Sequence, residues 1–261
     1  MDDLWTLAIA AIMAAAFVLS LAGGRWLYRA LAGPVADHGA STGAGYLVGA
    51  SLGLMSLLIG FSLALSLDRY EARRRLVGEE ASAIQTVWLR DQLLDPPYRA
   101  ELDGLLREYI RERSALPQLG LDSAALDAED QRTQRLQGQI WIATAAAVKG
   151  SDPRLTTTIL QATNEMFDIP GARRAALDAQ VPGPVFMTLV LVGLIAAALT
   201  GYALAASQRR HLVASSGLFV AAALIITLII ELDEPRTGLI RVSQAPFERM
   251  AGTILSAPPV K

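Results

Sequence analysis

The stretch that decides the fold is Gly39–Leu67, GASTGAGYLVGASLGLMSLLIGFSLALSL, followed at once by the charged run Asp68–Arg75, DRYEARRR. Gly39–Leu67 contains no charged side chain. A helix needs about 20 predominantly apolar residues to cross a hydrocarbon core about 30 Å thick. We therefore predict a transmembrane helix here. No Gly or Pro separates Leu67 from Val77, so this helix is expected to continue unbroken into the charged run.

Three further stretches are free of charge in the same way. They are Leu4–Gly24, Ala179–Gln208 and Leu212–Ile230. The chain of 261 residues is 52% hydrophobic and 18% charged, whereas soluble domains average about 25% charged residues. Four such helices exceed what the core of a soluble protein of this size could cover. The sequence therefore predicts an all-α membrane protein with four transmembrane helices.

The region between the second and third spans is polar. Residues 68–178 contain 15 Lys and Arg and 18 Asp and Glu, which favours a position in water. Apolar residues recur there with helical spacing. The predicted helices are Arg69–Leu94, one starting near Tyr98, about Glu129–Lys149, and one starting at Pro153. The predicted division is 1–67 for spans one and two, 68–180 for an extramembrane helical domain, 181–230 for spans three and four, and 231–261 for a C-terminal tail.

Several function classes are excluded by what the sequence lacks. It contains no cysteine, which removes thiolate nucleophiles and cysteine metal sites. A net charge of −2 argues against a nucleic-acid partner. There is no phosphate-binding loop, serine-nucleophile motif or zinc-protease motif, and no charge inside a span that would mark a proton-coupled transporter. We expect no enzyme activity, no cofactor and no metal site.

Five residues of the second span recur at four-residue spacing. They are Gly45, Gly49, Gly53, Leu57 and Phe61. Residues four apart are neighbours on a helix, so the glycines form a bare ridge that two large side chains continue. One interpretation is close helix packing, because small residues let backbones approach in lipid. The other is the wall of an ion pathway that is wide at the glycines and closed by an apolar collar.

The charged run after this span also has two interpretations. Arg69 and Arg73 could belong to a belt at the membrane interface or bind lipid head groups, with Tyr70 as an aromatic anchor. They could instead form the mouth of a pore and set its field. The acidic segment Glu231–Glu234 is interpreted as an interfacial cap, because it lacks the alternating oxygen ligands of a calcium loop.

Three segments carry a resemblance to a known family. They are Leu58–Arg74 (LIGFSLALSLDRYEARR), Asn164–Asp168 (NEMFD) and Gly238–Pro246 (GLIRVSQAP). On these segments the chain resembles the bacterial bestrophin-like domain family of membrane proteins. More distantly, it is similar to the bestrophin anion channels, in which the second span carries Gly-Phe and then an Arg-aromatic pair nine residues after the Gly. Gly60–Phe61 and Arg69–Tyr70 keep that spacing.

This resemblance implies a homo-oligomer, with five subunits as in bestrophins, and a pore lined by the second span. Its neck would fall on Gly53, Leu57 and Phe61, of which only Phe61 keeps a large aromatic type. The continuous acidic run of the bestrophin calcium clasp is not reproduced, so calcium gating is not carried over.

The functional hypothesis is a passive ion channel whose partners are membrane lipids, inorganic ions and further copies of itself. The alternative is a non-conducting membrane scaffold or sensor whose helical domain binds a partner or lipid head groups. Arginines near span ends favour the helical domain and the termini in the cytoplasm of a bacterial inner membrane, eight against four, although the first span and its loop favour the opposite.

Overall fold

The computed structural model describes residues 2–31, 38–116, 123–205, 209–234 and 240–258. These residues form eight α-helices and no β-strand. The helices are α1 (Asp2–Leu31), α2 (His38–Asp91), α3 (Pro96–Ala115), α4 (Ser123–Ala147), α5 (Pro153–Asp178), α6 (Gly183–Ala203), α7 (Arg209–Asp233) and α8 (Ala245–Ser256). The all-helical prediction is confirmed for this part of the chain.

The chain divides into two compact units. The first, here called the membrane unit, comprises Met1–Tyr70 and Gln180–Ile240. The second, here called the helical unit, comprises Glu71–Ala179 and Arg241–Lys261. Helix α2 contributes to both, because it is one unbroken helix of 54 residues. The expected continuation of the second span into the charged run is therefore confirmed.

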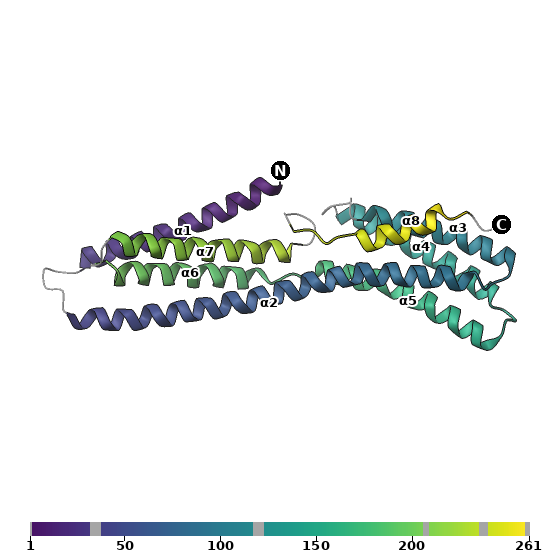
Figure 1. Cartoon of the computed structure of the whole chain (residues 1–261), viewed down its shortest axis with the longest axis horizontal. Coiled ribbons are helices and arrows are strands. Elements are labelled where there is room, and N and C mark those ends of the chain that lie inside the picture. The colour runs from purple at the N-terminus through teal and green to yellow at the C-terminus, as the bar shows by residue number, and fades with distance from the viewer. Residues whose placement is uncertain (1, 32–37, 117–122, 206–208, 235–239, 259–261) are drawn as a thin grey trace. The chain divides into compact units, whose positions relative to one another are not determined.

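The membrane unit contains α1, the apolar part of α2, α6 and α7 (Figure 1). Four helices of the described chain are long and apolar enough to cross a membrane, and each contains most of one of the four charge-free stretches of the sequence. Helix α1 packs against α6 and α7. At the centre of this packing, the rings of Phe17 and Phe219 meet edge to face with centroids 6.2 Å apart, so the core of the unit is apolar and aromatic.

Helices α1 and α6 approach each other at backbone distance. A Cβ atom placed on Gly201 would lie 1.9 Å from the carbonyl oxygen of Leu21, and one on Gly24 would lie 1.9 Å from that of Ala198. A Cβ on Gly193 would collide with the ring of Phe17. These glycines follow the rule for membrane helices that small residues allow close contact.

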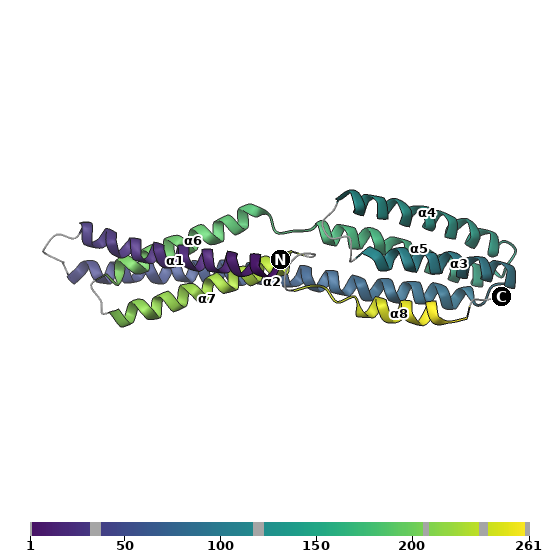
Figure 2. The ribbon, with the colours of Figure 1, turned by 90° about the horizontal axis from the view of Figure 1, so that it is seen from above.

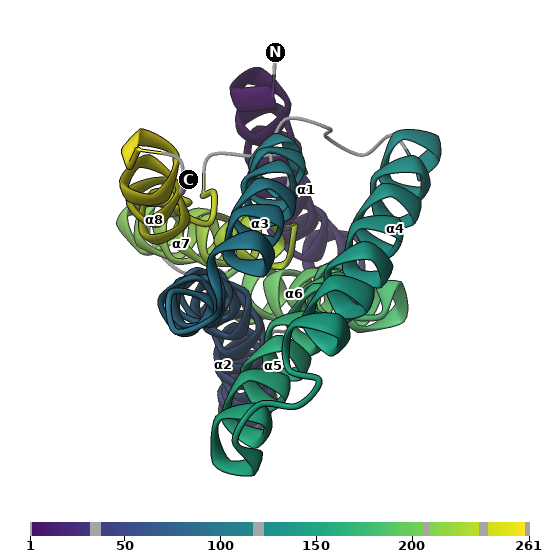
Figure 3. The same cartoon turned by 90° about the vertical axis from the view of Figure 1, so that its right-hand side faces the viewer.

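The helical unit contains the rest of α2 with α3, α4, α5 and α8. Helix α3 packs against α4 and α8 and lies between them in Figures 2 and 3. The core of the helical unit contains buried aliphatic and sulfur side chains that recur at helical spacing. Among them are Ile84, Leu106, Ile110, Ile140 and Met166.

Two helices of this unit differ from the sequence prediction. Helix α4 begins at Ser123 rather than about Glu129, because the Ala-rich start favours helix and Leu126 is buried. The segment predicted only as a tail contains α8, whose Phe247 and Ile254 are buried in the core. Arg107 donates to the carbonyl oxygens of Leu255 (3.2 Å) and Ala257 (3.1 Å), which pairs free carbonyls at the end of α8.

Candidate functional site

The five-residue row predicted to line a pore lies on exposed surface of α2. Leu57 is 56% and Phe61 is 67% exposed. Gly45, Gly49 and Gly53 are also exposed, and a Cβ atom added to any of them would meet nothing within 4 Å. These three glycines therefore do not serve close packing among the described residues.

The opposite side of α2 faces the rest of the membrane unit. Met55, Ser62 and Ser66 are buried, with 4%, 6% and 0% of their surfaces exposed. The exposed face of the same stretch of α2 carries large apolar side chains, including Leu54 (51% exposed) and Leu65 (43% exposed). A membrane helix with one face buried and the other apolar and exposed has its free face against lipid, another subunit or a pore.

The predicted row winds around α2 rather than following its axis. At 3.6 residues per turn, each step of four residues advances about 40° around the helix. Gly53, Leu57 and Phe61 therefore span about 80° and share one face, whereas Gly45 lies about 160° around the helix from Phe61. All five are exposed because the first part of α2 is accessible on most of its circumference.

Arg69, predicted at the pore mouth, is bound within the membrane unit. Its Nη1 lies 3.3 Å from Oδ1 of Asp233. Asp233 also accepts the backbone N–H of Val181 at 3.0 and 2.8 Å, just before α6 begins. Asp233 thus joins the end of α7, the approach to α6 and the end of the apolar part of α2. This carboxylate acts as a structural partner.

Arg73, the second residue predicted at the mouth, is buried inside the helical unit with 4% exposed. Its Nε donates to the carbonyl oxygen of Ala176 (2.9 Å) and its Nη2 donates to that of Ala179 (2.8 Å). These are carbonyls at the end of α5, which have no partner within the helix. The guanidinium is therefore engaged in holding α5 against α2. Neither of the two predicted arginines is presented on the face that carries Leu57 and Phe61.

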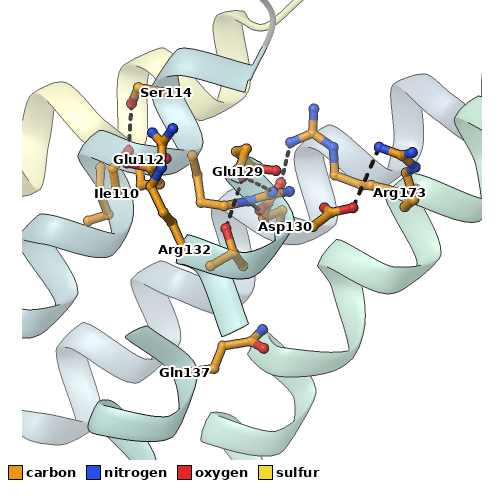
Figure 4. Close-up of polar contacts among 12 residues, drawn as sticks. Ile110, Glu112, Ser114, Glu129, Asp130, Arg132, Gln137 and Arg173 are labelled. Atoms are coloured by element: carbon orange, nitrogen blue, oxygen red, sulfur yellow. Dashed lines mark hydrogen bonds and ion pairs between the residues drawn. The ribbon is translucent and has the colours of Figure 1, made fainter. Parts of the chain in front are cut away.

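A buried network of ion pairs joins four helices of the helical unit (Figure 4). Glu80 of α2 accepts from Nε of Arg113 in α3 at 2.6 Å and from Nη1 of Arg173 in α5. Arg113 also donates to Glu129 of α4 at 2.7 Å, and Thr133 donates to the same carboxylate at 2.9 Å. All five residues are buried. This network fixes the mutual positions of α2, α3, α4 and α5.

The electrostatics of the network follow from its geometry. Burial by itself raises the pKa of Glu80, but the guanidinium groups of Arg113 and Arg173 outweigh it and hold that pKa below the ordinary value. The second buried carboxylate of α2 has no such partner. Burial and the neighbouring Asp103 raise the pKa of Asp91 to about 7, since both favour the neutral form.

No group of three or more His, Cys, Asp or Glu side chains that could hold a metal ion occurs in the described residues. The bestrophin-like domain profile matches residues 12–247. The chain belongs to the bestrophin-like domain family.

Solved structures support the bestrophin-like fold over almost the whole chain. Two single-substitution variants of a bacterial bestrophin homologue from Klebsiella pneumoniae align with TM-scores of 0.67 and 0.68 at 14% and 12% identity, each covering 95% of this chain and 95% and 97% of theirs. A structure of that homologue phased with zinc aligns with a TM-score of 0.63 at 14% identity, covering 96% and 95%. At such identities the likeness shows the fold alone. No match was found among curated proteins.

Membership of the bestrophin-like family confirms the resemblance read from Leu58–Arg74 and the two shorter segments. Together with its four apolar helices, it identifies the chain as a multi-pass membrane protein. Sequence reasoning missed the Glu80 network, although the sequence itself contains Glu80, Arg113 and Arg173. The available signal was that each of them falls on the apolar face of its helix, where a charge needs a partner.

Proposed function

We propose that this protein is one subunit of an oligomeric channel that conducts ions passively, with α2 lining the pore. The observation that carries the proposal is the apolar face of α2, where more than half of the surface of Leu57 and of Phe61 is exposed while Met55 and Ser66 are buried on the other side. The bestrophin-like fold adds support, because α2 is the counterpart of the span that lines the bestrophin pore by resemblance.

In this mechanism, the α2 helices of several subunits surround an axial path. Gly53, on the face of Leu57 and Phe61, leaves the path wide because it presents no side chain, whereas Gly49 and Gly45 lie about 120° and 160° around α2 from Phe61 and do not share that face. Leu57 and Phe61 form an apolar constriction that gates by dewetting. The number of subunits is proposed as five by resemblance to bestrophins. We also propose that Glu71–Ala179, the part of the helical unit between the second and third spans, lies outside the bilayer. We assign it, with both termini, to the cytoplasmic side of a bacterial inner membrane.

The substitution Phe61→Ala, with a matched control, tests the constriction. Purified protein in planar bilayers is expected to show current, and Phe61→Ala to increase the open conductance by removing the collar. Trp26→Ala is the control, because Trp26 is an equally exposed aromatic residue (69%) on α1. Absence of current in both the wild type and Phe61→Ala overturns the proposal. It would then favour the non-conducting scaffold or sensor that binds a partner or lipid head groups through its helical unit.

The absence of cysteine from the sequence makes a second test possible. Leu57→Cys is expected to react with a charged, membrane-impermeant thiol reagent and to lose current on reaction. Leu191→Cys on α6 is the control, with a similar exposed fraction (58%) outside the proposed pore. Equal loss of current in both variants, or in neither, contradicts a pore lined by α2.

A further inference from the structure

Four large apolar side chains recur every seven residues along α1 and are exposed. They are Trp5 (71% exposed), Ile12 (70%), Leu19 (69%) and Trp26 (69%). Positions seven apart differ by about 20° around a helix, so the four form one stripe. Trp26 follows Trp5 by 21 residues, a rise of about 32 Å, which matches a hydrocarbon core about 30 Å thick. Because tryptophan favours the two membrane–water interfaces, Trp26 marks the level of the lipid head groups near the end of α1.

The membrane unit is positively charged at the level of Trp26. Arg25 and Arg29 lie on either side of this residue in the sequence, and residues four apart are neighbours on a helix. The segments that lead from α1 to α2 and from α6 to α7, residues 25–38 and 204–211, contain four Arg and one Asp. Few acids therefore compete for the guanidinium groups at this end.

Arg25 is partly enclosed where α1 meets the end of α6. Its side chain is partly buried, and its Nη1 is buried without a hydrogen-bond partner among the described residues. The residue before it, Gly24, lies so close to Ala198 of α6 that a Cβ atom would be 1.9 Å from the carbonyl oxygen. Nearby, the rings of Tyr28 and Tyr202 meet edge to face with centroids 5.2 Å apart. A buried N–H of a charged group is costly to leave unpaired, so this guanidinium favours an anionic acceptor from outside the chain.

We propose that Arg25 and Arg29 bind the phosphate group of an anionic phospholipid whose acyl chains lie along the stripe of α1. A guanidinium matches phosphate oxygens with two parallel N–H···O bonds, and the level of Trp26 places both arginines at the depth of lipid phosphates. A lipid with net negative charge fits better than a zwitterionic one, because four Arg against one Asp leave an excess of positive charge. Helix α7, which begins at Arg209, adds the partial positive charge of its N-terminus at the same end.

The test is a titration of the full chain in detergent with phosphatidylglycerol, with bound lipid counted by native mass spectrometry. The wild type is expected to bind phosphatidylglycerol more tightly than phosphatidylcholine, which carries no net charge. Arg25→Gln is expected to weaken phosphatidylglycerol binding about tenfold, the loss of one charge-assisted hydrogen bond. Arg29→Gln is expected to weaken it about threefold, because an exposed charge contributes less. Arg154→Gln, at an exposed arginine in the first turn of α5, is the control and should bind like the wild type.

Equal binding of the two lipids by the wild type overturns the choice of an anionic lipid. Wild-type affinity in both Arg25→Gln and Arg29→Gln overturns the site. Displacement of phosphatidylglycerol by an equal concentration of glycerol 3-phosphate identifies a site for free phosphate groups and overturns the lipid. Arg29 is exposed, so Arg29→Gln is expected to fold like the wild type and decides the question even if Arg25→Gln does not fold. Conduction plays no part in this measurement, so loss of the channel proposal leaves the lipid site standing.

Discussion

The glycines of α1 and α6 and those of α2 stand in opposite environments. At Gly24 and Gly201 the two helices touch at backbone distance, with no room for a Cβ atom. At Gly49 and Gly53 a Cβ atom would meet nothing within 4 Å. Helix α2 is instead attached to its neighbours by long side chains, above all by Glu80 in the helical unit. One chain thus uses glycine both to seal an interface and to leave a surface bare, and spacing alone does not tell the two apart.

The strongest test of how α2 is attached is Glu80→Gln. This change leaves the buried guanidinium of Arg173 without an anionic partner and weakens the position of Arg113. Breaking a buried ion pair in this way costs about 3–5 kcal/mol, so we expect a large loss of unfolding free energy, measured by thermal unfolding of the detergent-solubilised chain. The control is Glu112→Gln, whose pair with Arg132 is 21% and 52% exposed and worth at most about 1 kcal/mol. Equal effects would contradict the network.

A second test uses Asp91, a buried carboxylate of α2 whose ionisation destabilises the folded state. Its raised pKa of about 7 means that the folded state favours the neutral acid. Stability is therefore full below the ordinary Asp pKa, falls as pH rises toward 7, and levels off above it. Asp91→Asn is expected to remove this slope and to raise stability at pH 8 by about 2–4 kcal/mol.

The measurement is the unfolding midpoint between pH 4 and pH 8. Asp95→Asn serves as the control, because this neighbouring carboxylate is exposed. A midpoint for Asp91→Asn that falls with pH as steeply as that of the wild type would refute the assignment.

The smallest effects compare the two kinds of glycine directly. Gly201→Ala is expected to destabilise the membrane unit by about 1–3 kcal/mol, because the backbones must separate to admit a methyl group. Gly53→Ala is expected to be neutral or to stabilise by up to about 1 kcal/mol through helix propensity. Thermal unfolding in detergent measures both. A loss of stability for Gly53→Ala as large as that for Gly201→Ala would mean that the α2 face is tightly packed in the assembly. That result would contradict a wide pore at Gly53.

Much of the fold could be predicted, because membrane spans and amphipathic helices depend on local composition and on the short-range periodicity of apolar residues. The four charge-free stretches are the four candidate spans, and the absence of Gly or Pro before Val77 predicted the unbroken α2. Helix α8 could not be recognised, because its Phe247 and Ile254 become meaningful only once a core exists to receive them. For the Glu80 network the sequence does place each charge on the apolar face of its helix, but the partners of Glu80 are 33 and 93 residues away, so the sequence does not say which charges meet.

The candidate site shows where sequence spacing fails. The arginines were predicted at the mouth because the charged run follows the second span directly, and Arg69 and Arg73 also continue the four-residue repeat from Phe61. The helix repeats every 3.6 residues, so after two and three further steps the row has turned about 80° and 120° toward the buried side. Asp68 breaks the four-residue rule and yet shares the face of Phe61. Only the burial pattern of α2 shows which side is inward.

The reach of Glu80 has a consequence for how the protein is made. Its partner Arg173 lies 93 residues further along the chain, so at about 5–20 residues per second it leaves the ribosome roughly 5–20 s later. During that interval the apolar half of α2 can already enter the bilayer while the polar half waits, with an unpaired carboxylate, for α5 to be synthesised. We therefore expect the yield of correctly assembled protein to depend on translation speed across this segment.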